Sequence, residues 1–190
     1  MSRVFWVRHG PTHAKTMVGW SDLPADLSDT AALARLSDHL PGDALVVSSD
    51  LTRAVATADA IAGPRPRLPH DPDLREIHFG AWELQRHDSV DDPDLLFQFW
   101  DAPGDVRPPG GESWNEVTAR VDRAVARLMA AYPGRDIVAV AHFGAILTQL
   151  QQALRVDAYT AFAQPIDTLS VTELAWSDDG WQARRINHRP

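Results

Sequence analysis

The 190-residue chain has no cysteine and a single lysine, Lys15, beside seventeen arginines. The lack of cysteine excludes disulfides, a thiolate nucleophile and sulfur-ligated zinc or iron–sulfur sites. No apolar run approaches the roughly 20 residues that cross a bilayer, and the first residues pass directly into a strand-like run rather than a secretory signal. We therefore expect no membrane partner and a cytoplasmic location.

The chain also has few positive charges relative to negative ones, with a formal net charge of −8. Such a balance disfavours nucleic acid as a partner. Hydrophobic residues make up 44% of the chain, including seven tryptophans, which is enough for a packed core. We expect one domain over residues 1–190, without internal repeats. Assembly into a homo-oligomer is compatible with these data.

Hydrophobic periodicity indicates alternating strands and helices. Short apolar runs predict buried strands at 4–7, 44–47 and 137–141. Apolar residues at helical spacing predict helices at 33–40, 51–61, 112–132 and 145–154, the second capped by Asp50, and a hairpin over 169–186 closes the chain. This order predicts an α/β fold, a three-layer αβα sandwich with a largely parallel central sheet. The Asp- and Pro-rich segment Gln85 to Gly111 is expected to be an irregular excursion over the active face.

Four motifs carry residues suited to chemistry. Arg8-His9-Gly10 follows the first predicted strand, where α/β proteins keep their active sites. Further along stand Ser48–Ala54, Leu74–Glu83 and Val140–Gly144. In this order and over Arg3 to Asn187, the chain resembles the histidine phosphatase superfamily, the phosphoglycerate mutase-like proteins. The resemblance implies a phosphoglycerate mutase-like fold and phosphoryl transfer without a cofactor or metal.

The resemblance also implies the roles of five residues. His9 corresponds to the nucleophile that forms a phosphohistidine, a role that suits an imidazole that is largely neutral near pH 7. Arg8 and Arg53 correspond to the two arginines that clamp phosphate oxygens in pairs. His142 corresponds to a second phosphate donor, and Glu76 to the acid that protonates the leaving oxygen and then activates water.

Further candidates surround these five. Expected phosphate contacts are Gly10, Thr12, Lys15 and Gly144, with Lys15 standing where the family commonly has asparagine. An aromatic wall for a ring-bearing leaving group is expected from Trp20, Phe79, Trp82 and Trp114, although such residues are also typical of a core. The position of Arg53 independently indicates an anion site. A cation in the first turn of a helix is disfavoured by the helix dipole unless an anion binds there.

Three other readings stand beside a phosphatase. His9 and His13 have the spacing of zinc ligands, with Glu76 or His142 to complete the site, but Pro11 between them argues against a shared helical face. A phosphoglycerate mutase would use the same residues, and a non-catalytic relative would bind a phosphometabolite without turnover. We favour hydrolysis of a small-molecule phosphate monoester, in the branch that includes α-ribazole and broad-specificity phosphatases. The short 85–111 excursion predicts an open site that admits water.

Overall fold

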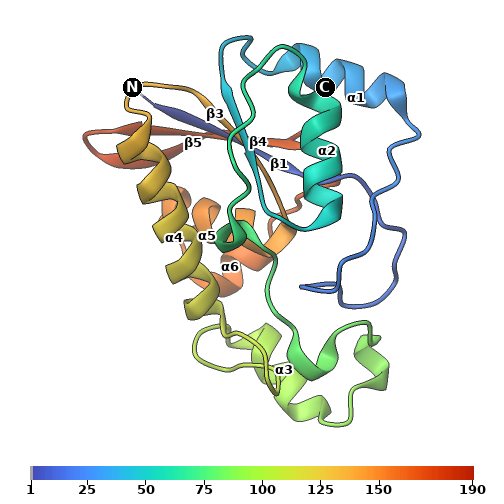
Figure 1. Ribbon diagram of the computed structural model, residues 1–190. Coiled ribbons are helices and arrows are strands. Elements are labelled where there is room, and N and C mark those ends of the chain that lie inside the picture. The colour runs from blue at the N-terminus through green and yellow to red at the C-terminus, as the bar shows by residue number, and fades with distance from the viewer. Residues whose placement is uncertain (1) are drawn as a thin grey trace.

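A five-stranded sheet lies between two layers of helices in the computed structural model, which describes residues 2–190 (Figure 1). The strands are β1 (Arg3–Arg8), β2 (Leu45–Ser48), β3 (Ile137–Ala141), β4 (Val171–Ser177) and β5 (Gly180–His188), in the order β2-β3-β1-β4-β5. The helices are α1 (Thr30–His39), α2 (Thr52–Ala62), α3 (Pro93–Asp101), α4 (Trp114–Ala131), α5 (Phe143–Leu154) and α6 (Ala158–Phe162). Strands β2, β3 and β1 are parallel, and β4 and β5 join as an antiparallel hairpin.

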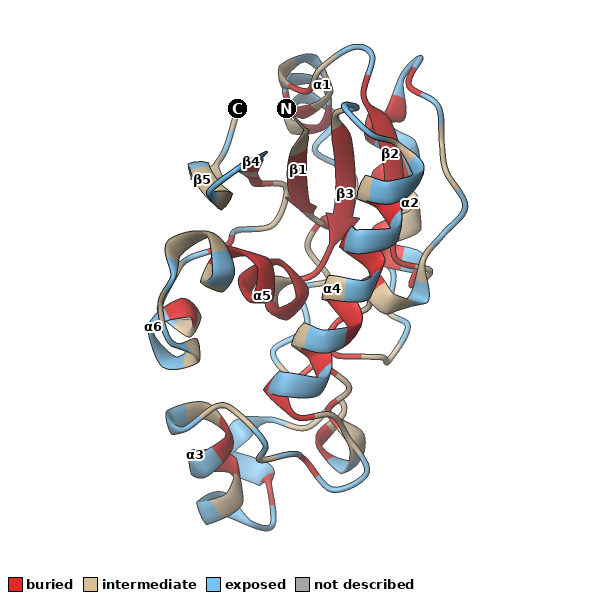
Figure 2. Cartoon of the chain, turned by 90° about the vertical axis from the view of Figure 1, so that its left-hand side faces the viewer, coloured by how far each residue is buried: buried red, intermediate tan, exposed pale blue. Residues whose placement is uncertain are grey.

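The three parallel strands are buried almost throughout (Figure 2). Alternate residues of β1 pack on opposite helical layers. Phe5 and Val7 of β1 pack in a cluster with side chains of α1 and α2. Val4 and Trp6 belong to the other cluster, which contains the buried faces of α4 and α5. This two-residue alternation is the geometry of a strand with both faces covered, and it confirms the expected three-layer architecture.

The register of the parallel strands brings their carboxyl ends to one level. Arg8 of β1 is paired with Ala141 of β3, and Ser48 of β2 with Val140. The next residue of each strand therefore emerges at the same edge of the sheet, where α/β folds position functional groups.

The segment from Gln85 to Gly111 is more regular than its composition predicts. It contains α3, whose first turn is capped by the Asp92 carboxylate accepting the Leu95 N–H at 2.9 Å, with Pro93 as the first helical residue. Both are helix-start signals that the abundance of Asp and Pro concealed. Helix α3 lies at the end of the molecule toward which the parallel strands run (Figure 1).

Helix α2 begins without the predicted cap. Leu51 occupies the N-cap position and Asp50 instead pairs with Arg75. The cap comes from a distant loop, because the Asp22 carboxylate accepts hydrogen bonds from the Thr52 N–H and hydroxyl, both at 2.7 Å. Among the helices of residues 2–190, none has the length and apolar character needed to cross a membrane.

Candidate active site

Three motif residues meet at the carboxyl edge of the sheet. His9, Ser49 and His142 each follow the last residue of a parallel strand, and all three are buried. The N–H of His9 donates to the Ala141 carbonyl at 3.1 Å, and the N–H of Ser49 donates to the Val140 carbonyl at the same distance. The strand register thus brings the two imidazole rings to a centroid separation of 5.0 Å.

The hydrogen bonds of His9 select one tautomer. Its Nδ1 lies 2.7 Å from the Gly10 carbonyl oxygen, which can only accept, so Nδ1 carries the proton. The other nitrogen, Nε2, then keeps its lone pair, and the Nε–H of Arg53 points at it from 3.3 Å. His9 is consequently a neutral imidazole with a nucleophilic nitrogen beside a guanidinium.

Burial, and next the Arg53 guanidinium, lower the pKa of His9 to about 3. The neighbouring Arg8 guanidinium acts in the same direction, while the Gly10 hydrogen bond opposes it. The imidazole therefore stays unprotonated at neutral pH, as a nucleophile must.

His142 directs an unpaired donor into the same buried region. Its Nε2 is 2.6 Å from the Ser49 hydroxyl, and the Ser49 oxygen also accepts the Leu51 N–H at 3.4 Å. We assign the Ser49 hydroxyl as the donor to Nε2, which places the proton of His142 on Nδ1. Within residues 2–190, this buried Nδ1 has no hydrogen-bond partner.

Both arginines are held by backbone carbonyls rather than carboxylates. The two terminal nitrogens of Arg53 donate to the carbonyls of Ser21 at 2.9 Å and Gly19 at 2.6 Å, and its side chain is 1% exposed. One terminal nitrogen of Arg8 donates to the Ile166 carbonyl at 2.6 Å, and its Nε has no partner in the described chain. Carbonyls orient a guanidinium without neutralising it, so the site keeps positive charge for an anion.

Glu76 reaches the amino end of α5. Its carboxylate accepts the Gly144 N–H at 2.9 Å through Oε1, which also accepts the Ile77 N–H at 2.9 Å. A Cβ on residue 144 would lie 2.5 Å from that oxygen, so only glycine admits the contact. The Gly144 amide, which was expected to bind phosphate, donates to Glu76 in this structure.

Of the other expected phosphate contacts, the structure gives Gly10 a different partner. Its N–H donates to the Thr57 hydroxyl at 2.9 Å. The hydroxyl of Thr12 accepts the Ala14 N–H at 3.4 Å. Lys15 is exposed and lines a separate hollow with Arg86 and two adjoining residues. The phosphate roles of Thr12 and Lys15 remain predictions.

The expected aromatic wall is mostly core. Phe79, Trp82 and Trp114 are 6%, 3% and 1% exposed and belong to one buried cluster. Phe79 and Trp82 pack edge-on against Phe99 of α3 at centroid distances of 6.3 and 5.6 Å. They fix the 85–111 segment to the domain instead of lining an open pocket. Trp20 alone is half-buried, and its Nε1–H donates to the Glu76 carbonyl at 2.9 Å.

The two reactive groups themselves expose little surface. His9 and Glu76 are 6% and 7% exposed. Residues 2–190 hold no cluster of three His, Asp or Glu side chains that could bind a metal. His13, the proposed partner of His9 in a zinc site, is exposed and its Nε2 lies 2.7 Å from Asp26.

Glu83 has a structural role that its motif alone did not indicate. Its carboxylate accepts the backbone N–H groups of Trp20 at 2.7 Å, Gly19 and Phe79 at 3.1 Å and Ser21 at 3.2 Å, together with the Ser21 hydroxyl at 2.6 Å. Burial alone would raise the pKa of Glu83, but the hydrogen bonds outweigh it, so this pKa lies below its usual value. Glu83 thereby holds the 19–21 loop whose carbonyls orient Arg53.

The family model of the histidine phosphatase superfamily (branch 1) matches residues 4–189. The chain belongs to this superfamily. Glucosyl-3-phosphoglycerate phosphatase Rv2419c, a mycobacterial protein of known structure, is 30% identical, covers 99% of both chains and superposes with a TM-score of 0.82. The resemblance drawn from the four motifs and the expected fold are both confirmed.

Two curated relatives are each 30% identical to this chain. The adenosylcobalamin/alpha-ribazole phosphatase of Salmonella typhimurium aligns over 82% of this chain and 81% of its own length. Bifunctional protein Rv2228c of Mycobacterium tuberculosis aligns over 97% of this chain and 53% of its own length. The chain thus spans about half the length of the latter relative. Phosphatases among the relatives and neighbours support an enzyme of this family.

The neutral state of the two buried histidines can be measured. Burial and the neighbouring positive groups hold the pKa of His142, like that of His9, well below the ordinary value of 6.5. We expect both rings to stay neutral between pH 8 and pH 5 in NMR spectra of histidine-labelled protein, whereas the urea-unfolded chain titrates near 6.5.

The same shifts imply a direction for stability. Below pH 6.5 the two histidines bind protons in the unfolded chain but not in the folded chain. Their contribution to the free energy of unfolding is therefore complete above pH 6.5 and is lost as the pH falls. A His9 signal, assigned by its loss in His9→Asn, that titrates near pH 6.5 in the folded protein would contradict this geometry.

Replacing Glu83 should impair the phosphate clamp. Glu83→Gln presents an amide N–H₂ to backbone donors, and loss of charged hydrogen bonds of this kind costs about 2 kcal/mol. We expect kcat/KM to fall roughly thirtyfold and vanadate inhibition to weaken in parallel, because Arg53 loses its orientation. Glu173→Gln removes a carboxylate paired only with Arg3 and serves as the control. Unchanged vanadate inhibition in Glu83→Gln would separate Glu83 from the clamp.

Proposed function

We propose that this protein hydrolyses small-molecule phosphate monoesters through a covalent phosphohistidine on His9. The observation that carries the proposal is a nitrogen that keeps its lone pair, Nε2 of His9, in the same site as two buried nitrogens that have no partner within residues 2–190, Nδ1 of His142 and Nε of Arg8. Buried donors without partners are rare and are explained where a ligand completes them. A phosphoryl group supplies several acceptor oxygens at once, and two guanidiniums that are hydrogen-bonded to backbone carbonyls favour its charge.

In the first step, Nε2 of His9 attacks phosphorus and the bond from phosphorus to the ester oxygen breaks. Arg8, Arg53 and His142 donate to the phosphoryl oxygens, where negative charge accumulates. Glu76, protonated in this step, gives its proton to the departing alkoxide, because a poor alcohol leaves only when protonated. The products are an alcohol and a phosphohistidine, with Glu76 left as a carboxylate.

In the second step, water attacks the phosphohistidine. Glu76 accepts a proton from that water, the bond between phosphorus and Nε2 breaks, and inorganic phosphate leaves. His9 returns to the neutral tautomer set by the Gly10 carbonyl. The cycle balances without a metal or cofactor.

The substrate class rests on the relatives. Their names refer to phosphatases of α-ribazole and of glucosyl-3-phosphoglycerate, both small metabolites. Only small fractions of His9 and Glu76 are exposed. A phosphate group on a small molecule therefore fits the candidate active site better than a phosphorylated protein surface does.

His9→Ala should abolish turnover and the phosphoenzyme together, since no other group replaces the imidazole nitrogen. The phosphohistidine is a phosphoramidate and hydrolyses in acid. The phosphoenzyme is therefore formed from a radiolabelled monoester and trapped by an alkaline quench. His39→Ala, which alters a histidine on α1, is the control and should retain both signals. Full turnover by His9→Ala would rule out the mechanism.

Glu76→Gln should discriminate between leaving groups. Phosphoenzyme formation from an alkyl phosphate should slow by about 100-fold, within the range for loss of a general acid. Formation from p-nitrophenyl phosphate should change little, because its acidic phenol leaves without a proton. Single-turnover measurements separate this step from the later attack of water. Equal slowing with both substrates would remove Glu76 from the acid role.

Hydrolysis and mutase activity share the first step and differ in what the phosphohistidine meets next. With 3-phosphoglycerate and catalytic 2,3-bisphosphoglycerate, we expect phosphorus NMR to show inorganic phosphate accumulating. A mutase must exclude water until an acceptor hydroxyl returns. Rapid formation of 2-phosphoglycerate with negligible inorganic phosphate would establish the mutase alternative instead.

A further inference from the structure

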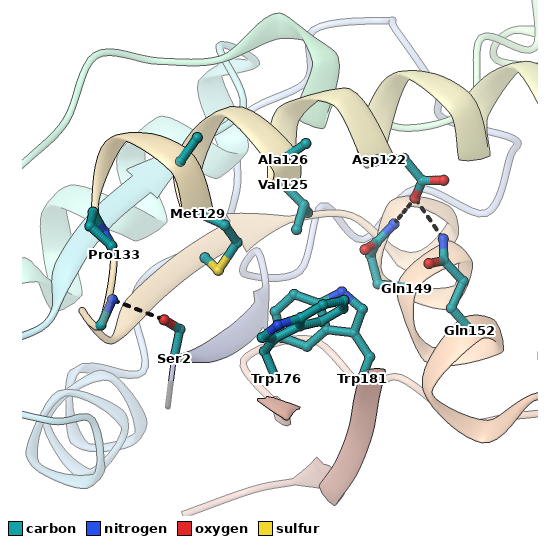
Figure 3. Close-up of a pocket in the computed structure, with 12 residues that line it drawn as sticks. Ser2, Asp122, Val125, Ala126, Met129, Pro133, Gln149, Gln152, Trp176 and Trp181 are labelled. Atoms are coloured by element: carbon teal, nitrogen blue, oxygen red, sulfur yellow. Dashed lines mark hydrogen bonds between the residues drawn. The ribbon is translucent and has the colours of Figure 1, made fainter. Parts of the chain in front are cut away.

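A cavity of about 590 Å³ lies between α4, α5 and the β4–β5 hairpin (Figure 3). None of the residues that line it belongs to the candidate active site. Its size is within the range of small-molecule sites, about 300 to 1,000 Å³. The cavity is therefore large enough for a ligand of its own.

Two indole rings form its floor. Trp176 and Trp181 pack edge to face across the hairpin, with ring centroids 5.2 Å apart and planes inclined by 68°. In Figure 3 they lie below Val125 and Met129 of α4. Trp176 remains 48% exposed, so a large aromatic surface faces solvent beside the cavity. An indole face that is open to solvent attracts an organic cation that lies within about 6 Å of its ring centroid.

The charge of the lining has one sign. Asp122 is the sole charged side chain among the described residues around the cavity. Its Oδ1 accepts hydrogen bonds from Nε2 of Gln149 at 2.8 Å and Nε2 of Gln152 at 2.6 Å, both from α5 (Figure 3). Two neutral amides hold this carboxylate in place without cancelling its charge, so the cavity favours a positive ligand.

We propose that this cavity binds a small organic cation, an alkyl- or arylammonium with an apolar body. The ammonium lies against the indole faces and within the field of Asp122, and the apolar body contacts Val125 and Met129. A neutral molecule of the same shape gains only the apolar contact, and an anion is opposed by Asp122. Binding here is independent of the phosphatase proposal, because the two sites share no residue.

The test compares two probes of matched shape, phenyltrimethylammonium and neutral tert-butylbenzene. Binding is followed by indole N–H signals in NMR, with Trp176 and Trp181 assigned through their Phe variants, and by calorimetry for the cation. We expect the cation to shift both indole signals and to bind at least about fivefold more tightly than the neutral probe. His9→Ala should bind it equally well even if the proposed catalysis fails.

Variants test the charge. Asp122→Asn retains the Oδ1 acceptor for both glutamines, so the fold is preserved, and we expect it to weaken cation binding about fivefold or more. Asp38→Asn, on the exposed surface of α1, makes the same change in net charge and should have no effect. The proposal is overturned if the cation fails to shift the two indole signals, if the neutral probe binds equally well, or if Asp122→Asn binds like wild type. Self-association that buries Trp176, detected by sedimentation, would assign the face to a second copy instead.

Discussion

The parallel register of β2, β3 and β1 is the constraint on which the rest of the site depends. It ends three strands at one level, so that His9, Ser49 and His142 emerge together although the sequence separates them widely. Hydrogen bonds then orient the two imidazoles, that of His9 to the Gly10 carbonyl and that of His142 to the Ser49 hydroxyl. A shift of one residue in any strand would turn the following side chain to the opposite face and dismantle the pair of imidazoles.

Buried positive charge follows from how the arginines are held. Arg8 donates to one backbone carbonyl and Arg53 to two, and these carbonyls orient the planar guanidinium but carry no full negative charge. The positive field of the two arginines, added to burial, keeps the histidine between them neutral. One electrostatic arrangement thus attracts an anion and preserves the nucleophile, and carboxylate partners for the arginines would weaken both effects.

The motifs and periodicities predicted the layers and the strand ends, because these depend on local pattern and on strand order. They did not predict partnerships formed across the fold. Asp22 rather than Asp50 caps α2, and Glu76 occupies the Gly144 amide that was expected to bind phosphate. Helix α3 was concealed because Asp and Pro at a helix start have the same composition as a loop. The aromatic residues are more typical of a core than of a wall, and burial distinguished the two.

Glu76 and Glu83, seven residues apart in one motif, show why residue type alone does not determine a role. The carboxylate of Glu83 receives five donors from the loop around Trp20 and from Phe79, which leaves it little capacity to move a proton. Glu76 receives the N–H groups of Ile77 and Gly144, and its backbone carbonyl is fixed by Arg120 at 2.6 Å. Fewer donors bind its carboxylate, so it is the glutamate with lone pairs left for a proton. Each position depends on a neighbouring glycine, since a side chain at Gly19 would displace Glu83 from its loop and one at Gly144 would displace Glu76 from α5.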